Sequence, residues 1–201
     1  MNNAQFRVYL VDDDAGVRTA LSRVISIAGY DVQTFADAEA FLDQHDPEAP
    51  GCAVVDLSLP GKDGFEVQAA MASCGRPVVF LTGQGTIQTG VRAIKAGAVD
   101  FLEKPIEAAT LLTTIEKARQ VDCQSRSLLN ERREFQERIE RLTPRERQVL
   151  YKVAEGRLNK QIAGDLGTVE KTIKVHRARM MEKMGVRTVA DLVRVVERFH
   201  Q

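Results

Sequence analysis

The feature that most constrains this chain is an alternation in its first 120 residues, where five short apolar runs are separated by amphipathic stretches. The runs are apolar at nearly every position, as parallel strands are when helices cover both faces of a sheet. Repeats of strand then helix predict a doubly wound α/β fold built on a five-stranded parallel sheet. The predicted strands lie at 8–11, 32–35, 53–55, 78–81 and 99–102, and the predicted helices at about 17–28, 38–44, 64–73, 87–96 and 107–120.

A second segment, residues 108–141, contains no Pro or Gly and is rich in Glu, Arg, Gln and Leu. This composition predicts one long helix, or two with a break, exposed over much of its surface. Its apolar positions leave room for a short coiled-coil contact with a second copy of the chain. These positions are Leu128, Leu129, Phe135, Ile139 and Leu142.

The third segment opens with a strong helix-start signal. Thr143 is a good N-cap, Pro144 suits the first helical position, and Glu146 completes a capping box. The first helix should end at Gly156, and a tight turn is predicted at Gly167. Four short helices arranged in this way predict a compact helix-turn-helix module. The other three helices are predicted at about 159–166, 169–184 and 189–199.

Charge divides the chain at the same places. Residues 1–120 carry 10 Lys and Arg against 16 Asp and Glu, residues 121–141 carry 5 of each, and residues 142–201 carry 13 against 7. The net charges of −6, 0 and +6 predict an acidic domain at 1–120, a helical linker at 121–141 and a basic domain at 142–201. A basic domain favours a polyanionic partner, although a solvated surface would also carry such charge.

Composition excludes several classes of protein. With 201 residues, 44% of them apolar and 28% charged, the chain has an ordinary globular composition. No apolar run approaches the roughly 18 residues of a membrane span, and the polar residues 1–5 are not a signal peptide. We therefore expect a cytoplasmic protein with no membrane partner. Cys52, Cys74 and Cys123 are odd in number and lack metal-binding spacing, so we expect free thiols.

Polar and charged side chains follow several of the predicted strands. Because carboxyl ends of parallel strands meet at one edge of a sheet, these side chains should lie beside the crevice where such folds bind ligands. Gathered carboxylates repel one another unless a hard cation neutralises them, which predicts Mg²⁺ at Asp13, Asp56 and a nearby backbone carbonyl. Thr82 and Lys104 could then hold the oxygens of a phosphoryl group. The full set is Asp12, Asp13 and Asp14 after the first strand, Asp56 after the third, Thr82 after the fourth and Lys104 after the fifth.

Four short motifs at these strand ends resemble the response-regulator receiver domain of two-component signalling, which has a flavodoxin-like fold. The motifs are Val11-Asp12-Asp13, Asp56 with Pro60, Thr82-Gly83 and Lys104-Pro105, within about residues 5–120. The resemblance implies that a sensor histidine kinase phosphorylates Asp56. It also implies that Asp12, Asp13, Asp56 and the backbone carbonyl of Ser58 hold Mg²⁺, that Thr82 and Lys104 are catalytic, and that Thr82 and Phe101 form the switch.

Other roles are open for some of these residues. Asp14 suits the N-cap of the helix that follows it, and Thr82 alone could be a strand-end hydroxyl. The alternative function is a Mg²⁺-dependent phosphatase that forms an aspartyl phosphate. Such enzymes of the haloacid-dehalogenase type place a second acid two residues after the nucleophile, and this chain has Ser58 there. A nucleotide-binding protein is disfavoured because no Gly-rich phosphate loop follows any strand.

Residues 142–198 resemble the LuxR-type helix-turn-helix domain. Together with the receiver motifs they resemble the FixJ/NarL family of response regulators, closest to FixJ. The residues that carry this resemblance are Leu142-Thr143-Pro144-Arg145-Glu146-Arg147, Val149-Leu150, Gly156, Asn159-Lys160, Ile162-Ala163, Leu166, Lys171-Thr172, Lys174-Val175-His176, Lys183-Met184 and Leu192. The resemblance implies a transcription regulator that binds promoter DNA, dimerises when phosphorylated and acts on RNA polymerase, and that is not an enzyme beyond its own phosphorylation and dephosphorylation.

The third helix of this module should face DNA with its basic side. Ile173, Met180 and Met184 can face the core. By the family pattern, Lys174 and Val175 contact base edges, while Lys160, Lys171 and Thr172 contact the backbone. Arg177 lies on the same basic side and is also expected to bind DNA. The chain departs from the family at Val169, where a Ser usually caps this helix. Thr168 could cap one residue earlier, which would shift the register of the DNA contacts.

Overall fold

The computed structural model describes residues 6–83 and 85–199. They form two compact units, Met1–Ser127 and Leu128–Gln201. No helix in these described ranges is long and apolar enough to span a membrane. The three cysteines are free thiols, as expected, and Cys52 is buried.

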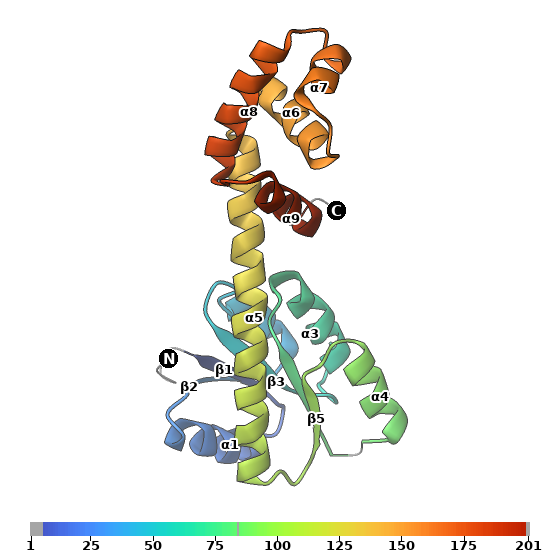
Figure 1. Ribbon diagram of the computed structural model, residues 1–201. Helices are drawn as coiled ribbons and strands as arrows, with labels where there is room; N and C mark the ends of the chain where they lie inside the picture. Colours follow the sequence, from blue (N-terminus) through green and yellow to red (C-terminus); the bar gives the residue numbers. More distant parts are fainter. Residues whose placement is uncertain (1–5, 84, 200–201) are drawn as a thin grey trace. The chain divides into compact units, whose positions relative to one another are not determined.

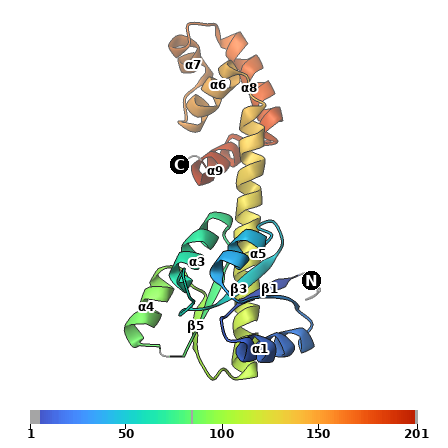
Figure 2. The same ribbon diagram turned by 180° about the vertical axis from the view of Figure 1, so that it is seen from behind.

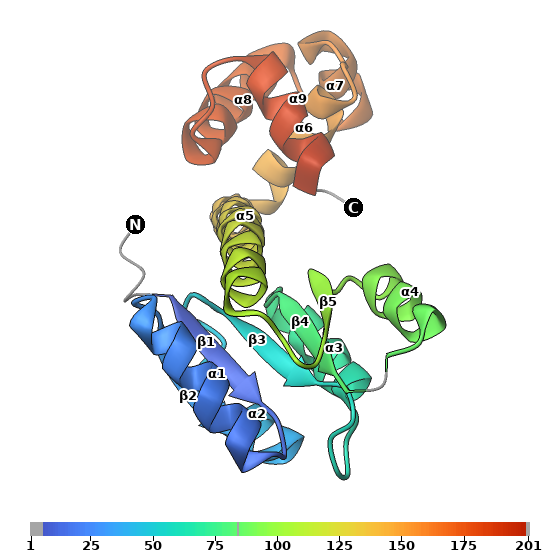
Figure 3. The same cartoon turned by 90° about the horizontal axis from the view of Figure 1, so that it is seen from below.

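The first unit contains a five-stranded parallel sheet in the order β2-β1-β3-β4-β5, which confirms the predicted doubly wound fold (Figure 3). Strand β1 lies between β2 and β3, so that Val8 is level with Val32 on one side and with Cys52 on the other. The strands are β1 (Arg7–Val11), β2 (Asp31–Phe35), β3 (Gly51–Asp56), β4 (Val78–Thr82) and β5 (Asp100–Glu103).

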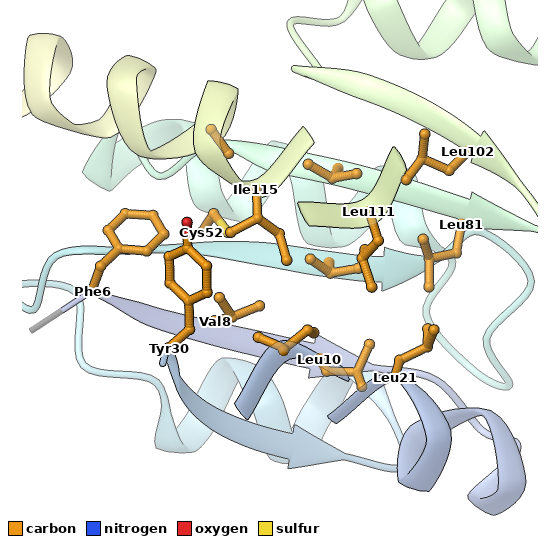
Figure 4. Packing of buried hydrophobic residues seen from close by; sticks show 14 residues of the cluster. Phe6, Val8, Leu10, Leu21, Tyr30, Cys52, Leu81, Leu102, Leu111 and Ile115 are labelled. Atoms are coloured by element: carbon orange, nitrogen blue, oxygen red, sulfur yellow. The ribbon is translucent and has the colours of Figure 1, made fainter. Parts of the chain in front are cut away.

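Helices cover both faces of this sheet (Figure 1). The side chains of Leu21 in α1 and of Leu111 and Ile115 in α5 pack on one face, together with alternate strand residues such as Val8 (Figure 4). Phe41 of α2 and the helices α3 and α4 pack on the other face. The helices are α1 (Ala15–Ile27), α2 (Ala38–Gln44), α3 (Gly64–Met71), α4 (Ile87–Lys95) and α5 (Ala108–Glu140), the last being the single long helix that the sequence allowed.

A buried arginine lies at the edge of the sheet where the strands begin. Arg76, which precedes β4, is 5% exposed. Its Nη2 donates to the backbone carbonyls of Asp46 and Ala49, and its guanidinium lies 4.6 Å from the centre of the Tyr9 ring. Its Nε and Nη1 have no hydrogen-bond acceptor among the described residues. A buried cation of this kind needs a negative charge nearby.

Helix α5 supplies that charge through Asp122. This carboxylate is also 5% exposed, and it pairs with Arg126 one turn later at 3.7 Å. Burial raises the pKa of Asp122, and the charges of Arg126 and Arg76 and a hydrogen bond from the backbone of Gly51 only partly offset this. A Cβ atom at Gly51 would lie 2.3 Å from the backbone carbonyl oxygen of Arg7 and 2.7 Å from Nη1 of Arg76, so only glycine fits there. Arg76, Asp122, Arg126 and Gly51 are called the Arg76 cluster below.

The second unit is a bundle of four short helices with its own apolar core (Figure 2). Phe135 and Ile139 of α5 and Leu142 are buried in this core. The expectation that they contribute to a coiled coil with a second copy is therefore wrong for these three, while Leu128 and Leu129 are exposed. The helices are α6 (Pro144–Ala154), α7 (Asn159–Asp165), α8 (Glu170–Met184) and α9 (Val189–Phe199).

Helix α6 begins as predicted. Thr143 is its N-cap, Pro144 is its first residue, and the reciprocal bonds between Thr143 and Glu146 form a capping box. Glu146 is 2% exposed, and Lys183 of α8 donates to it at 2.6 Å. Burial alone would raise the pKa of Glu146, but the hydrogen bonds from Lys183 and Thr143 outweigh it and the pKa is lowered. This ion pair therefore joins α6 to α8.

Helix α8 begins at Glu170 with Val169 as its N-cap, so the cap that the sequence left open at Thr168 is not the one used. Val169 is the N-cap and has no side-chain capping bond, while its backbone carbonyl accepts from the amides of Thr172 and Ile173. The amide of Thr168 instead donates to the carbonyl of Ala163 and closes the turn after α7. The register of α8 is therefore fixed by backbone bonds, with Lys171 as its second residue.

The ion pair between Glu146 and Lys183 should stabilise the second unit. We expect Glu146→Gln to lower the free energy of unfolding by about 1–3 kcal/mol, because a buried charge-assisted hydrogen bond is lost. The lowered pKa means that this contribution is present above the ordinary glutamate pKa of about 4.3 and is lost as the pH falls through the lower folded value. Stability of the wild type should therefore fall more steeply in acid than that of the variant.

The chain has no tryptophan, so unfolding is followed by circular dichroism, with hydrogen exchange of α6 and α8 to assign it to this unit. Glu155→Gln is the matched control, because Glu155 is exposed at the end of the same helix. Equal stability of Glu146→Gln and the wild type at neutral pH would contradict the role of the pair.

Candidate functional site

The strands run parallel, so their carboxyl ends lie at one edge of the sheet (Figure 3). Predicted strand-end residues meet at this edge. Asp12 follows β1, Asp56 is the last residue of β3, and Thr82 is the last residue of β4. Lys104 follows β5, and its backbone amide donates to the carbonyl of Thr82 at 2.7 Å. Asp12, Asp56 and Thr82 are buried, whereas Asp13 is exposed. The parallel topology thus gathers side chains that are up to 92 residues apart in sequence.

Lys104 is bound to two carboxylates at once. Its Nζ lies 2.6 Å from Oδ2 of Asp12 and 2.6 Å from Oδ2 of Asp56. Both carboxylates are less than a tenth exposed, and the lysine side chain is 19% exposed. Burial lowers the pKa of Lys104, but the hydrogen bonds to Asp12 and Asp56 raise it more, so the net pKa is raised. Lys104 therefore stays charged and holds the two carboxylates together.

Three carboxylates converge closely enough to share one ion. One oxygen from each of Asp12, Asp13 and Asp56 lies within 4.8 Å of the other two. Lys104 neutralises one of the three formal negative charges, which leaves two. A hard divalent cation fits both this charge and the all-oxygen donor set, and Mg²⁺ is bound in proteins by one or two carboxylates with retained waters. The residues present therefore fit the predicted Mg²⁺ site.

Neighbouring groups fix the orientation of these carboxylates. Oδ1 of Asp56 accepts from the backbone amide of Ser58 at 3.0 Å. Oδ1 of Asp12 accepts from the amide of Asp14 at 3.0 Å. Asp14 itself caps α1 by accepting from Gly16 and Val17, as predicted. Arg18 was not predicted from the sequence, and its Nη1 donates to the carbonyl of Asp12 at 2.6 Å.

Thr82 and Phe101 lie on either side of a glycine that the sequence analysis also missed. A Cβ atom at Gly85 would lie 2.8 Å from Cγ2 of Thr82 and 2.8 Å from Cε1 of Phe101. The ring of Phe101 also faces Gly90 of α4, where a Cβ atom would lie 3.4 Å from it. The partly buried Phe101 ring therefore packs between the backbone of the β4–α4 segment and the end of β5. Thr82 and Phe101 thus both border Gly85, and the Phe101 ring also borders α4 at Gly90.

The second unit presents most of the predicted DNA-contacting residues on its surface. Lys160, Lys171, Lys174 and Val175 are exposed, and Thr172 is half-buried. These residues come from α7 and α8, which pack together (Figure 2). The core side of α8 is as predicted, because Ile173, Met180 and Met184 are buried.

Two of the basic residues already have partners in the protein. Nη1 of Arg177 donates to Oδ1 of Asn159 at 2.8 Å and so joins α8 to the start of α7. Nζ of Lys174 lies 3.2 Å from Glu170 one turn before it. Neither partner was predicted, because each depends on which side chains face each other in the folded unit. Arg177 is therefore positioned by α7, and Lys174 must exchange Glu170 for any base that it contacts.

Family comparisons divide the chain in the same two parts. Residues 8–116 match the response regulator receiver domain. Residues 140–196 match the bacterial regulatory proteins of the luxR family. The first unit is therefore a receiver domain, and the second contains a LuxR-type DNA-binding domain. A receiver domain implies a histidine kinase partner, and a LuxR-type domain implies binding to DNA.

Several similar proteins match this chain along nearly its whole length. Response regulator protein TmoT of Ectopseudomonas mendocina is 42% identical over 200 residues, which cover 98% of this chain and 91% of TmoT. Transcriptional regulatory protein FixJ of Bradyrhizobium diazoefficiens is 39% identical over 194 residues, covering 95% of this chain and 94% of FixJ. The solved structure of response regulator StyR has a TM-score of 0.82 and 43% identity, covering 98% of this chain and all of that one (100%).

The chain belongs to the response regulators of two-component signalling, and within them to the FixJ/NarL type that joins a receiver to a LuxR-type DNA-binding domain. Its function is transcription regulation, as in the similar response regulators. This confirms the family and the function predicted from the strand-end motifs and the helix-turn-helix module.

The contact between Thr82, Gly85 and Phe101 can be tested directly. We expect Gly85→Ala to displace the Phe101 ring and to lower the free energy of unfolding by about 1–3 kcal/mol, because the added methyl group overlaps two side chains. The ring position is measured by ¹⁹F NMR of fluorophenylalanine-labelled protein and the stability by urea unfolding. Gly83→Ala is the matched control, since a Cβ atom there meets nothing within 4 Å. An unchanged ring signal in Gly85→Ala would contradict the contact.

Proposed function

We propose that Asp56 accepts a phosphoryl group from a sensor histidine kinase with the help of Mg²⁺, and that this modification controls promoter binding by the second unit. The observation that carries this proposal is the joint hold of Lys104 on Asp12 and Asp56 beside a third carboxylate. A structural ion pair needs one carboxylate, whereas this arrangement leaves excess negative charge at an edge open to solvent through Asp13. Excess charge at a ligand-binding edge favours a functional site.

The proposed Mg²⁺ ligands are Asp12, Asp13, Asp56 and the backbone carbonyl of Ser58. When bound, the ion would stabilise the charge that develops on the transferring phosphoryl group. The chain's own residues would do the rest. An oxygen of Asp56 attacks the phosphorus, the bond from phosphorus to the histidine nitrogen of the kinase breaks, and an aspartyl phosphate forms.

Lys104 and Thr82 are proposed to bind the phosphoryl oxygens. In the unmodified protein both oxygens of Asp56 accept hydrogen bonds, one from Ser58 and one from Lys104. Lys104 must therefore exchange Asp56 for a phosphoryl oxygen while it keeps Asp12. The Thr82 hydroxyl would move toward the phosphoryl group, and Phe101 would follow into the space that Thr82 leaves. Ser58 offers no acid to protonate a leaving group, so the chemistry is self-phosphorylation and slow dephosphorylation and not phosphatase turnover on other substrates.

We further propose that the phosphorylated protein is a homodimer that uses α4. Three large apolar residues of α4 are exposed, Ile87 (88%), Val91 (48%) and Ile94 (49%). They lie four and then three residues apart and so share one face of the helix. Gly90, which borders this face on the same helix, meets the ring of Phe101. A change in the Phe101 ring would thus alter how this apolar face is presented to a second copy.

The remaining proposals concern the domains and partners. The receiver would occupy residues 1–120, the linker 121–141 and the DNA-binding domain 142–201. Contacts with promoter DNA would come from Lys160, Lys171, Thr172, Lys174, Val175 and Arg177. We also infer that the bound regulator acts on RNA polymerase. Because both promoter DNA and the phosphorylating domain of a sensor kinase are found in the cytoplasm, that is the proposed location.

The phosphoacceptor role predicts a simple labelling result. Full-length protein with Mg²⁺ and acetyl phosphate should gain one phosphoryl group per chain, and Asp56→Asn should gain none. Removal of Mg²⁺ with EDTA should strongly slow labelling of the wild type. Intact-mass spectrometry measures the added group.

Asp14→Asn is the matched control for this experiment, because Asp14 lies at the same edge but caps α1. It should be labelled like the wild type. Undiminished labelling of Asp56→Asn would remove the central claim. Sustained hydrolysis of p-nitrophenyl phosphate by the wild type would instead favour the phosphatase alternative, and we expect almost none.

The proposed DNA contacts predict two different patterns of loss. Lys171→Ala should weaken binding about equally on a selected site and on random DNA and should reduce the salt slope by roughly one, because it contacts a phosphate. Lys174→Ala should cost about 1–3 kcal/mol on the selected site and much less on random DNA. Fluorescence anisotropy at several salt concentrations distinguishes them. Lys62→Ala in the receiver is the control, and equal losses of Lys174→Ala on both DNAs would demote Lys174 to a backbone contact.

A further inference from the structure

The helices of the second unit begin in two different ways. Helix α6 begins with the polar capping box at Thr143, and α9 begins with reciprocal hydrogen bonds between Thr188 and Asp191. The N-cap residues of α7 and α8 are Leu158 and Val169, whose side chains make no capping bond. At α7 the side chain of Gln161 accepts from the amide of Leu158 at 2.9 Å, whereas no side chain caps α8. A polar N-cap is worth about 0.5–2 kcal/mol, and both helices of the helix-turn-helix pair forgo it.

These aliphatic caps do not contribute to the core instead. Leu158 is 68% exposed and Val169 is 64% exposed, and neither belongs to the packed apolar cluster. Apart from Leu128 and Leu129 of α5, the large exposed apolar residues among the described part of this unit are Leu158, Val169 and Val175. All three therefore lie on α7 and α8, among the exposed Lys160, Lys171 and Lys174.

A surface that is both basic and aliphatic matches the chemistry of the major groove. The lysines suit phosphates, and the apolar group that the groove offers is the C5 methyl of thymine. In a helix-turn-helix the N-terminal residues of the second helix reach base edges, while the first helix crosses the backbone. Val169, at the tip of the second helix, is placed to reach a base, and Leu158, at the start of the first, is placed near the sugar and phosphate chain.

We propose that Val169 determines specificity by packing against a thymine methyl group, so that each bound subunit requires thymine at one further position of its half-site. This inference rests on the proposed DNA binding by α8. Val169 precedes Val175 by six residues, which is about 9 Å along the helix. Because base pairs are about 3.4 Å apart, the thymine lies within about three base pairs of the one that faces Val175.

The test removes a single methyl group from the DNA and the apolar side-chain end of Val169 from the protein. A binding site is first selected from random duplexes with full-length protein, and each thymine in it is then replaced by deoxyuracil, which differs only by that methyl. In each half-site we expect one thymine position at which replacement by deoxyuracil matters. Replacing that single thymine should weaken wild-type binding about fourfold, as expected for the loss of one buried methyl group. The same replacement should have no effect on Val169→Ser, which has lost the apolar partner.

Val169→Ser also separates contact from folding. Serine restores a polar cap, so α8 should be at least as stable as in the wild type and a loss of discrimination cannot come from unfolding. Val169→Ala, which introduces no polar group and shortens the side chain, should show a smaller uracil effect than the wild type. Lys171→Ala should weaken all duplexes but keep the uracil effect, and Val121→Ser, an exposed valine outside this unit, should change nothing.

Two negative results have different meanings. Suppose that the protein selects a site, and that every uracil replacement that weakens binding of the wild type also weakens binding of Val169→Ser. The assignment to Val169 is then wrong, and the DNA-binding function stands. If the full-length protein selects no sequence at all, whether phosphorylated or not, the proposed specific DNA binding fails and the assignment fails with it.

Discussion

The two hydrogen bonds of Lys104 are the interaction on which the receiver depends. They join the ends of β1 and β3 to the residue after β5, and so connect three strands through a single ammonium group. Without it, two buried carboxylates would face each other at the edge of the sheet, which is costly in a poorly solvated site. One of these bonds also engages Oδ2 of Asp56, the proposed phosphoacceptor. One lysine thus stabilises the carboxyl edge of the sheet, and in the proposed phosphorylation the same lysine would have to change partners.

Much of this arrangement could be predicted from the sequence because it follows from local rules and topology. Runs that are apolar on both faces indicate buried parallel strands, and once the strands are parallel their carboxyl ends must meet. The positions of Asp12, Asp56, Thr82 and Lys104 followed from that argument alone. The start of α6 at Thr143 followed from a capping box, which is a signal contained within four residues.

The features that were missed depend on contacts between distant segments. Nothing in the sequence near Phe135 or Ile139 says that these residues serve a core within their own chain and not a second helix. The role of Gly85 depends on how closely Thr82 and Phe101 approach it. The cap of α8, which the sequence left open at Thr168, depends on the backbone of the turn. The carbonyl of Val169 accepts from the amides of Thr172 and Ile173, while the amide of Thr168 donates to Ala163 and closes the preceding turn.

The Arg76 cluster bears on how proteins of this type are recombined. The family match for the receiver ends at residue 116, yet Asp122 and Arg126 belong to the packing of the opposite edge of the same unit. A chimaera that joined this receiver to another output domain at residue 116 would leave Arg76 buried without its carboxylate, whatever sequence came next. A junction placed after Arg126 keeps both charges. A receiver module for domain exchange should therefore extend beyond residue 116, where the family match ends, to at least Arg126. This adds about one third of the length of α5.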